Sequence, residues 1–508
     1  MRRIMSGSQM KAVDRVTIEE IGIPSAVLME RAAFEAYDVS GEYIKKGDRV
    51  LVVCGTGNNG GDGLAFARML RCGRGIVPDV FIAGNSKKGS DDFKLQADIT
   101  LKGLGCPQIE SLKTQTDAIL KYDVVVDAVF GTGLSRDVEG EYAKLIDLIN
   151  DFGRREGKTV ISIDIPSGIN ADTGVVMGRA VEADVTVTFG ALKAGLAVYP
   201  GAAHAGRVFV RDIGFPDEAY DKKPFARAIE DEDLKNIPER DPASNKGTYG
   251  KVLVVAGSGD TYGAAYLCAL SALRCGAGMV KVYTSRENKN LINKMLPEAM
   301  VATYGDSLDL SDYAAALEWA DVIVIGCGIG TGDLQRELVK GAMRAGKTTV
   351  IDADALNCIS GCPQLSEYFH EKCIITPHVG EMSRLTGIKA SRIKETAVLT
   401  AKKYAEEHSV TCVLKDARTV IAARDGECFI NMNGNDGMST AGSGDVLAGV
   451  IASLAGCGMN PFEAAAYGVF IHAKAGDLAA AETGRHGLIA GDITKKAADI
   501  FKNLEESD

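Results

Sequence analysis

The stretch Arg49-Val-Leu-Val-Val-Cys-Gly-Thr-Gly-Asn-Asn-Gly-Gly-Asp-Gly63 indicates the fold class of this chain. It begins as a short apolar run of strand type and continues as a glycine-rich loop over 55–63. Helical spacing of apolar residues then resumes over Leu64–Arg74. A strand, a glycine loop and a helix open a doubly wound α/β unit, in which ligands bind at the carboxyl ends of parallel strands. We therefore predict an α/β fold with a mostly parallel sheet.

Apolar runs and helical periodicity continue this pattern through the first part of the chain. Strands are predicted at Asp79–Ala83, Asp123–Val129, Thr159–Asp164 and Asp184–Phe189. Helices are predicted at Ser8–Glu20, Ser25–Tyr43, Asp91–Leu104 and Glu139–Arg154. A charged stretch with several prolines lies between Asp217 and Pro242 and predicts a boundary. We expect one domain at 1–222 and a second at 223–508.

A second α/β series starts at Lys251–Ala256, which is followed by the glycine loop Gly257–Gly263 and a helix over Ala264–Cys275. Strands are predicted at Met279–Tyr283, Val322–Ile325, Thr348–Asp352, Cys373–Thr376 and Val410–Lys415, with a hairpin of Val420–Ala423 and Cys428–Asn431. Helices are predicted at Val446–Leu454, Pro461–Glu482 and Asp492–Leu504. The two series share a style but no sequence repeat.

Composition restricts the class of protein. With 508 residues, two or three domains are expected, and 46% hydrophobic with 25% charged residues is typical of a soluble globular chain. The net charge of −11, without a basic stripe, argues against nucleic-acid binding. The sequence contains no run of 18 apolar residues and no signal peptide, so we expect a cytoplasmic protein without a membrane partner. The 12 cysteines form no CxxC pair, which argues against zinc and iron–sulfur sites.

Polar residues in the first glycine loop suggest a ligand site that is not a classical NAD site. Gly55–Gly60 fits G-x-G-x-x-G, but the second strand ends in Ala83-Gly84-Asn85 and lacks the acid that binds the ribose. An NAD-dependent dehydrogenase is therefore disfavoured. Asn58, Asn59 and Asp62 can coordinate a cation or contact phosphate.

Two later strand ends point to the same crevice as this loop. Asp127 and Asp164 each follow an apolar strand, although either alone can be a turn or cap residue. Asp164 is the candidate general base or acid, because flanking apolar residues can shield it. Asn59, Asp127 and Ser167 offer only oxygen ligands, which suit a hard cation.

The stretch Asn433–Gly449 is the candidate centre of the second half. We expect Gly442 and Gly444 to take positive φ, and the following helix start to offer N–H groups to an anion. Asp445 at that helix start can hold a metal or move a proton, whereas the alternative interpretation is an ordinary N-cap. His378, beside Glu381, and the strand-end Lys415 are further candidates, and Cys327 is expected to be a packing thiol.

Several long motifs in this order resemble the family of bifunctional NAD(P)H-hydrate repair enzymes. In the first half they are Gly57-Asn-Asn-Gly-Gly-Asp-Gly63, Asp127-Ala-Val-Phe-Gly-Thr-Gly-Leu134, Asp164-Ile-Pro-Ser-Gly-Ile-Asn170 and Thr188-Phe-Gly190. In the second they are Lys246-Gly-Thr-Tyr-Gly-Lys251, Asp352-Ala-Asp-Ala355, Thr376-Pro-His378 with Gly380-Glu381, and Gly442-Ser-Gly-Asp445. The resemblance implies a Rossmann-like epimerase domain followed by a ribokinase-like dehydratase domain.

The resemblance also implies functional residues in the first domain. By this analogy Asp164 is catalytic, and potassium is bound by Asn59, Asp127 and Ser167. The hydrated nicotinamide nucleotide is held by Asn58, Asn59, Gly60, Gly61, Asp62, Gly131, Thr132, Gly133, Leu134, Ser135, Arg136, Asp137, Tyr142 and Asp164.

In the second domain the resemblance implies an ADP-dependent dehydratase that acts on the S hydrate of NADH or NADPH, with magnesium. Asp445 is then catalytic and lines the hydrate with Ala264, Gly328 and His378. The adenine nucleotide is held by Lys415, Asp416, Ala417, Arg418, Thr419 and Gly444. We also expect a homo-oligomer.

Two alternatives remain open. A helix start with Gly-x-Gly-Asp also fits a small-molecule kinase of the ribokinase-like class, which would retain the phosphoryl group on its product. The first half could instead be a nucleotide-binding module without catalysis.

Overall fold

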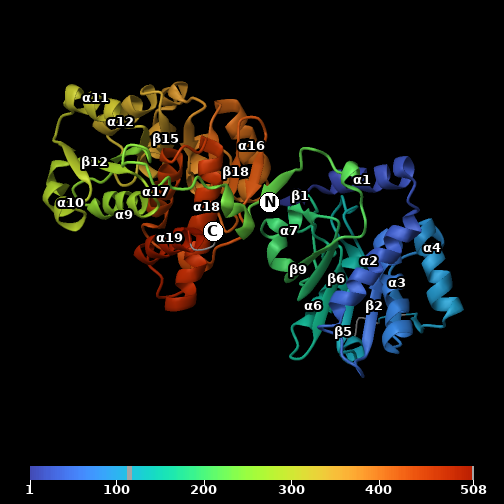
Figure 1. The fold of residues 1–508 in the computed structure, drawn as a ribbon. Helices are drawn as coiled ribbons and strands as arrows, with labels where there is room; N and C mark the ends of the chain where they lie inside the picture. The colour runs from blue at the N-terminus through green and yellow to red at the C-terminus, as the bar shows by residue number, and fades with distance from the viewer. Residues whose placement is uncertain (111, 113–116, 506–508) are drawn as a thin grey trace. The chain divides into compact units, whose positions relative to one another are not determined.

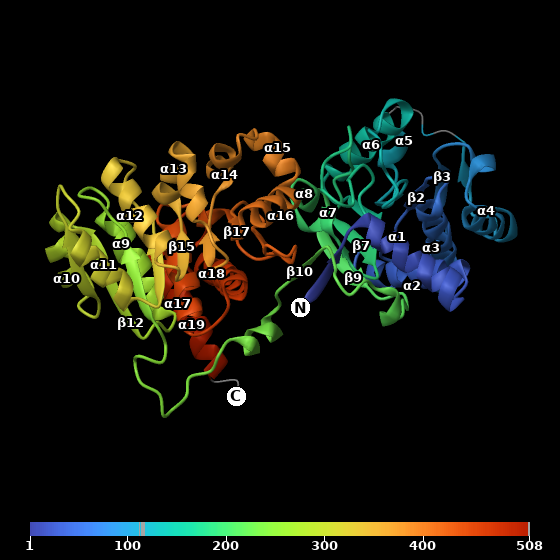
Figure 2. The ribbon, with the colours of Figure 1, turned by 90° about the horizontal axis from the view of Figure 1, so that it is seen from above.

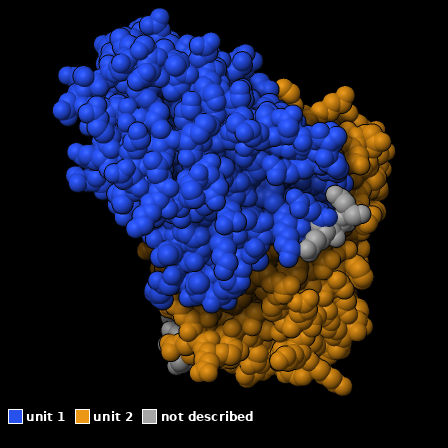
Figure 3. Space-filling view, turned by 60° about the vertical axis from the view of Figure 1, so that its left-hand side comes forward, with its two compact units in different colours: residues 1–2, 227–508 blue, residues 3–226 orange. Residues whose placement is uncertain are grey.

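The computed structural model describes residues 1–110, 112 and 117–505, which form two compact units. We call Arg3–Ala226 the first unit, and Met1–Arg2 together with the chain from Arg227 onward the second unit. Figure 3 shows each unit in its own colour. Each unit contains its own parallel sheet, which confirms the predicted α/β class.

The first unit is built on a seven-stranded sheet of order β4-β3-β2-β5-β6-β7-β9 in which all neighbours run parallel. The strands are β2 (Val50–Cys54), β3 (Asp79–Ile82), β4 (Gln108–Ile109), β5 (Val124–Ala128), β6 (Thr159–Ile163), β7 (Val185–Phe189) and β9 (Arg207–Arg211). The strand β8 (Leu192–Lys193) pairs instead with β1 (Arg2–Met5). The four predicted strands after the opening run are confirmed, whereas β1, β4, β8 and β9 were not predicted.

Both faces of this sheet are covered by helices, which gives three layers (Figures 1 and 2). Alternate residues of β2 enter different cores, with Val52 on one side and Leu51 on the other. The described helices are α1 (Gly7–Arg15), α2 (Ser25–Ser40), α3 (Asn58–Arg74), α4 (Asp91–Ala97), α5 (Asp117–Leu120), α6 (Gly140–Gly153), α7 (Ala194–Ala197) and α8 (Gly201–His204). The π-helical turns Val16–Ile21 and Asp98–Gly103 extend α1 and α4, so two predicted α-helices are only partly α-helical.

The glycine loop of the first unit is shorter than predicted. Helix α3 starts at Asn58, so residues 58–63 are helical and not loop. The glycines are needed for close packing: a Cβ on Gly60 would lie 1.9 Å from the carbonyl oxygen of Gly55. One on Gly63 would lie 2.6 Å from the Ala128 Cβ. These glycines allow the start of α3 to pack closely against the sheet. From sequence alone, the glycine-rich composition of this stretch predicts a loop.

The second unit contains a longer sheet of order β13-β12-β11-β14-β15-β16-β17-β18-β19-β10. Its strands are β10 (Ala226–Ala228), β11 (Lys251–Val255), β12 (Met279–Ser285), β13 (Met300–Tyr304), β14 (Val322–Ile325), β15 (Thr348–Ile351), β16 (Cys373–Ile375), β17 (Thr411–Leu414), β18 (Val420–Ala422) and β19 (Cys428–Ile430). Neighbours from β13 to β17 are parallel, and β17, β18 and β19 are antiparallel, which confirms the predicted hairpin.

Helix α17 (Ser443–Gly456) lies in the main core of the second unit. Every residue from Val446 to Leu454 is buried, and the helix packs against α9 (Tyr262–Arg274) and α18 (Pro461–Thr483). The other α-helices are α10 (Lys289–Met295), α11 (Leu310–Trp319), α12 (Asp333–Arg344), α13 (Ala353–Gly361), α14 (Val379–Thr386), α15 (Ala390–Glu395), α16 (Ala397–His408) and α19 (Ala490–Glu505). The buried body of the helix fixes the position of its half-buried first turn, residues 443–445. Among the described residues, no helix has the length and apolarity to cross a bilayer.

Candidate functional site

A cavity of about 600 Å³ opens in the first unit beside the residues that directly follow β2, β5 and β6. The predicted residues that line it are Asn58, Asn59, Asp62, Gly131, Thr132, Gly133, Leu134, Ser135, Arg136, Tyr142 and Asp164. Gly60 and Gly61 are buried inside α3 instead, and Asp137 is exposed on the surface. Three strand ends that are distant in sequence therefore meet at one cavity.

Asp164 is held in an unusual conformation at the cavity wall. Its φ of 68° lies in the left-handed region, which a non-glycine residue adopts at a cost of about 1 kcal/mol or more. Its Oδ1 lies 2.8 Å from the Lys193 Nζ and accepts a hydrogen bond of 3.4 Å from the Thr188 hydroxyl. Backbone strain combined with an ion pair fixes the direction of this carboxylate, as expected for a reactive group.

Two further acids line the cavity. Burial, followed by the charges of Asp164 and Asp14, raises the pKa of Asp62 well above its ordinary value. Asp14 also lines the cavity, and desolvation raises its pKa to about 6, a shift that the charge of Lys193 opposes and that of Asp164 reinforces. The cavity therefore combines a carboxylate paired with a cation and two acids whose pKa values lie above the ordinary range.

The three residues predicted to bind potassium lie in two different environments. Asp127 is fully buried and does not line the cavity; it accepts hydrogen bonds from Ser162 Oγ at 2.9 Å and from Ser167 N and Oγ at 2.8 and 2.6 Å. Desolvation raises its pKa, although these hydrogen bonds oppose the shift. The side-chain amide of Asn59, in contrast, has no hydrogen-bond partner among the described residues, although it is buried. An orphaned buried amide fits an oxygen-coordinated cation or a bound ligand.

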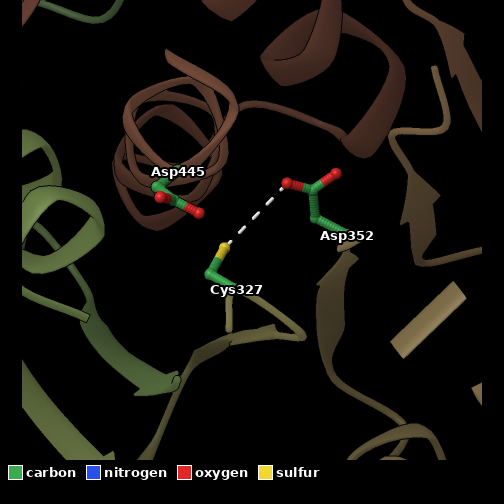
Figure 4. A group of neighbouring side chains, drawn as sticks. All are labelled: Cys327, Asp352 and Asp445. Atoms are coloured by element: carbon green, nitrogen blue, oxygen red, sulfur yellow. Dashed lines mark hydrogen bonds between the residues drawn. The ribbon is translucent and has the colours of Figure 1, made fainter. Parts of the chain in front are cut away.

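In the second unit, three side chains converge at the start of α17 (Figure 4). Asp445 comes from the first turn of α17, Cys327 from the turn after β14, and Asp352 from the end of β15. One donor atom from each lies within 4.8 Å of the others. The Cys327 thiol donates to Asp352 Oδ2 at 4.0 Å, so this cysteine contacts the carboxylates and is more than the predicted packing thiol.

Asp352 connects this group to Lys415. Its Oδ1 accepts hydrogen bonds of 2.7 Å from both the Lys415 Nζ and the Thr376 hydroxyl. Burial lowers the pKa of Lys415, but the nearby negative charges of Asp352 and Glu381 outweigh it and raise that pKa overall. The Lys415 ammonium therefore lies next to Asp352 at the site, where it can contact a bound anion.

Asp445 has the ionisation expected of a group that moves a proton. Burial and the charge of Asp352 raise its pKa to about 6, while a hydrogen bond from Cys327 and the charge of Lys415 lower it. Because this value lies near the ordinary working range, Asp445 can both accept and release a proton. Asp445 is not the N-cap of α17, because Gly442, with φ 88°, occupies that position.

Gly444 differs from its prediction. It is helical, so its backbone does not need positive φ. A Cβ at this position would lie 3.4 Å from Lys415 Nζ and 3.5 Å from Asp352 Oδ2, so the glycine leaves this corner open. The preceding loop is anchored by Asp477 of α18, which accepts hydrogen bonds of 2.8 Å from Gly434 N and Asn435 Nδ2.

The other predicted residues of the second unit lie on loops, at the N-cap of α14 and, for Ala264, in the first turn of α9. His378 caps α14, with its Nδ1 accepting from Gly380 N and Glu381 N, and its backbone forms a parallel bridge with Lys415. A Cβ on Gly328 would lie 3.2 Å from the Ala264 Cβ, so these two positions adjoin. In the stretch 416–419, Asp416 Oδ1 accepts from Ala417 N, Thr419 Oγ1 donates to the Asp416 carbonyl, and Arg418 donates to the Met432 carbonyl.

Sequence reasoning missed two groups at these sites, Lys193 and Asp14, which line the first cavity. A lysine inside the apolar run Ala191-Leu-Lys-Ala-Gly-Leu-Ala197 was the available signal for Lys193. Asp352, which links Lys415 to Asp445, was recognised as part of the motif Asp352-Ala-Asp-Ala355 but was given no role.

Two α/β units, each with acids and a lysine gathered at strand ends, are typical of enzymes that act on small molecules. The family model described as NAD(P)H-hydrate dehydratase matches residues 252–498, and the one described as YjeF-related protein N-terminus matches residues 25–195. Bifunctional NAD(P)H-hydrate repair enzymes from Moorella thermoacetica and Escherichia coli are 38% and 32% identical to this chain. They cover 99% and 97% of it, and it covers 97% and 94% of them. The chain belongs to the family of bifunctional NAD(P)H-hydrate repair enzymes.

Solved structures similar to the second part of the chain include the ADP/ATP-dependent NAD(P)H-hydrate dehydratase of Bacillus subtilis, with 29% identity and a TM-score of 0.48. It covers 55% of this chain, and 98% of its own length is matched. A ribokinase-like superfamily protein of Enterococcus faecalis shows 27% identity and a TM-score of 0.49, with 56% and 97% coverage. The observed sheets and the two matching family models confirm the predicted fold class: a three-layer α/β unit with a parallel sheet, followed by a second α/β unit.

Proposed function

We propose that this protein repairs hydrated NADH and NADPH in two steps. The first domain, predicted at 1–222, exchanges the R and S hydrates. The second, predicted at 223–508, dehydrates the S hydrate and converts ADP to AMP and phosphate. Membership of the family over nearly the whole chain supports this function. The observation that carries it is the placement of Asp445, with a pKa of about 6, at a helix start beside Lys415 and Asp352.

The dehydration chemistry follows from the poor leaving ability of hydroxide. Asp445 takes the proton of the ring hydroxyl, whose oxygen attacks the terminal phosphorus of ADP while AMP departs. Loss of a proton from the adjacent ring carbon and departure of phosphate then restore the double bond. The N–H groups at the start of α17 and the Lys415 ammonium stabilise the phosphoryl charge. Magnesium, when bound with the nucleotide, would neutralise further phosphate charge.

The proposed ligand contacts follow the predicted sets. In the second unit Ala264, Gly328 and His378 would hold the hydrate, and Lys415–Thr419 with Gly444 the adenine nucleotide. In the first unit the cavity residues would hold the hydrate near Asp164. Potassium would be held by Asn59, Asp127 and Ser167, and the orphaned amide of Asn59 supports a ligand there. A cytoplasmic location remains a prediction. So does a homo-oligomer, which size-exclusion chromatography can test.

One assay distinguishes this function from the kinase alternative. Purified protein is incubated with hydrated NADH, ADP and magnesium, and the absorbance of the reduced nicotinamide ring is followed together with inorganic phosphate. We expect both to rise in step. A phosphorylated product that accumulates without return of absorbance would identify a kinase and refute the dehydratase proposal.

A further inference from the structure

Lys193 is a buried cation in the wall of the first-unit cavity. It is 2% exposed, and its Nζ lies 2.8 Å from Asp164 Oδ1 and donates a hydrogen bond of 2.7 Å to the Phe189 carbonyl. Its backbone is fixed by the pairing of β8 with β1, where Met5 lies opposite Lys193. Burying an ammonium costs several kcal/mol unless it is paired, so Lys193 depends on its contacts with Asp164 and the Phe189 carbonyl.

The two oxygens of Asp164 have different neighbours. Oδ1 faces Lys193 and the Thr188 hydroxyl. Oδ2 points towards the loop after β5, since a Cβ built on Gly131 would lie 3.3 Å from it. Gly131 lines the cavity, so Oδ2 is the oxygen that a ligand can reach. Because the ion pair with Lys193 occupies Oδ1, Oδ2 is the Asp164 oxygen left free for a ligand.

Exchange of the hydrate epimers needs a base that can reach the ring hydroxyl, a role that a free carboxylate oxygen can fill. Addition of water across the double bond beside the ring nitrogen places the hydroxyl on the carbon bonded to that nitrogen. Removal of the hydroxyl proton forms a C=O bond while the carbon–nitrogen bond breaks, and the nitrogen receives a proton from an acid. Ring closure on the other face of the carbonyl reverses both proton transfers. The balance requires one base and one acid, and no oxidant.

We propose that Lys193 is the positioning residue of the epimerising centre: it holds Asp164 Oδ1 and so presents Oδ2 as the base. This inference rests on the proposed epimerase function of the first unit. Asp62 and Asp14, which line the same cavity and retain protons more readily than ordinary acids, are the available proton donors.

The test compares variants of the full chain by their R/S exchange rates. Lys193→Met keeps the length of the side chain and removes its charge, so we expect the turnover number to fall on the order of 100-fold with KM changed less than about 3-fold. Lys193→Ala leaves room beside Asp164, and ethylamine added to it should restore part of the rate. Lys158→Met is the control, because Lys158 is also a largely buried lysine of this unit, paired with Asp123 at 3.4 Å and outside the cavity.

The outcomes separate this inference from the function on which it rests. If the unaltered protein shows no R/S exchange, the proposed function fails. If it exchanges the epimers but Lys193→Met retains its turnover within a few-fold, only the role of Lys193 is refuted. A rate loss in Lys193→Ala that ethylamine leaves unchanged, with KM raised in proportion, would likewise overturn the positioning role.

Discussion

The Lys415 Nζ lies 2.7 Å from Asp352 Oδ1, and the other oxygen of the same carboxylate faces the Cys327 thiol beside Asp445. A single aspartate thus joins a strand-end lysine to the acid on α17. Neither Lys415 nor Asp445 pairs with the other directly in any described contact. The ionisation of the centre therefore depends on a residue that need not touch substrate.

The contact between Lys415 and Asp352 predicts that their substitutions have non-additive effects on stability in a double-mutant cycle. Lys415→Met leaves the carboxylate of Asp352 buried without its cation, which we expect to lower the free energy of unfolding of the second unit by about 3–5 kcal/mol. Adding Asp352→Asn should recover part of that loss, because the uncompensated charge disappears. Urea unfolding of the four proteins measures the coupling. Strictly additive losses would contradict the importance of the pair.

The two acids that we propose to be catalytic, Asp445 and Asp164, should act independently. Asp445→Asn should lower the dehydration rate on the order of 100-fold or more while R/S exchange continues. Asp164→Asn should do the reverse, since the acids lie in different units. Chromatographic separation of the epimers and the return of reduced-nicotinamide absorbance measure the two steps. Loss of both activities from either change, in a folded protein, would exclude two independent sites.

The pH dependence of dehydration should follow Asp445. As a base it must be ionised, so the rate should rise with pH through its pKa of about 6 and fall below it. Asp352→Asn removes a negative charge that raises this pKa, so the acid limb should move to lower pH. Rates at saturating hydrate and ADP between acidic and neutral pH give the profile. An acid limb at the same pH in both proteins would assign the titration to another group.

Gly60, in the first turn of α3, and Gly57, its N-cap, should differ sharply in their tolerance of a side chain. Gly60→Ala places a Cβ 1.9 Å from the Gly55 carbonyl oxygen, so we expect a loss of about 1–3 kcal/mol or more in the stability of the first unit. Gly57→Ala is the matched control, because no atom lies within 4 Å of its Cβ position. Thermal unfolding should rank Gly60→Ala well below Gly57→Ala. Equal melting temperatures would show that α3 can move away from the sheet.

The sequence pattern located most of the central strands of both sheets, because buried parallel strands are short apolar runs. It predicted Asp164 and Asp445 because both follow an apolar strand or precede an apolar helix. The orientation of the side chains could not be predicted. Asp127 also lies near the end of a strand, yet its side chain accepts hydrogen bonds from Ser162 and Ser167. Lys193 was missed because its function depends on Asp164, 29 positions earlier, and a lysine in an apolar run carries no local sign of its partner.

The left-handed backbone of Asp164 limits which residues can replace it. Asparagine and glycine adopt this conformation readily, whereas alanine and branched residues resist it. A relative that has given up epimerisation can therefore discard the carboxylate without rebuilding the turn, provided that it changes to asparagine or glycine. The residue at this position in a relative therefore distinguishes two cases. Asparagine or glycine indicates loss of the carboxylate with the backbone turn kept, and other residues indicate that the whole strand end has been remodelled.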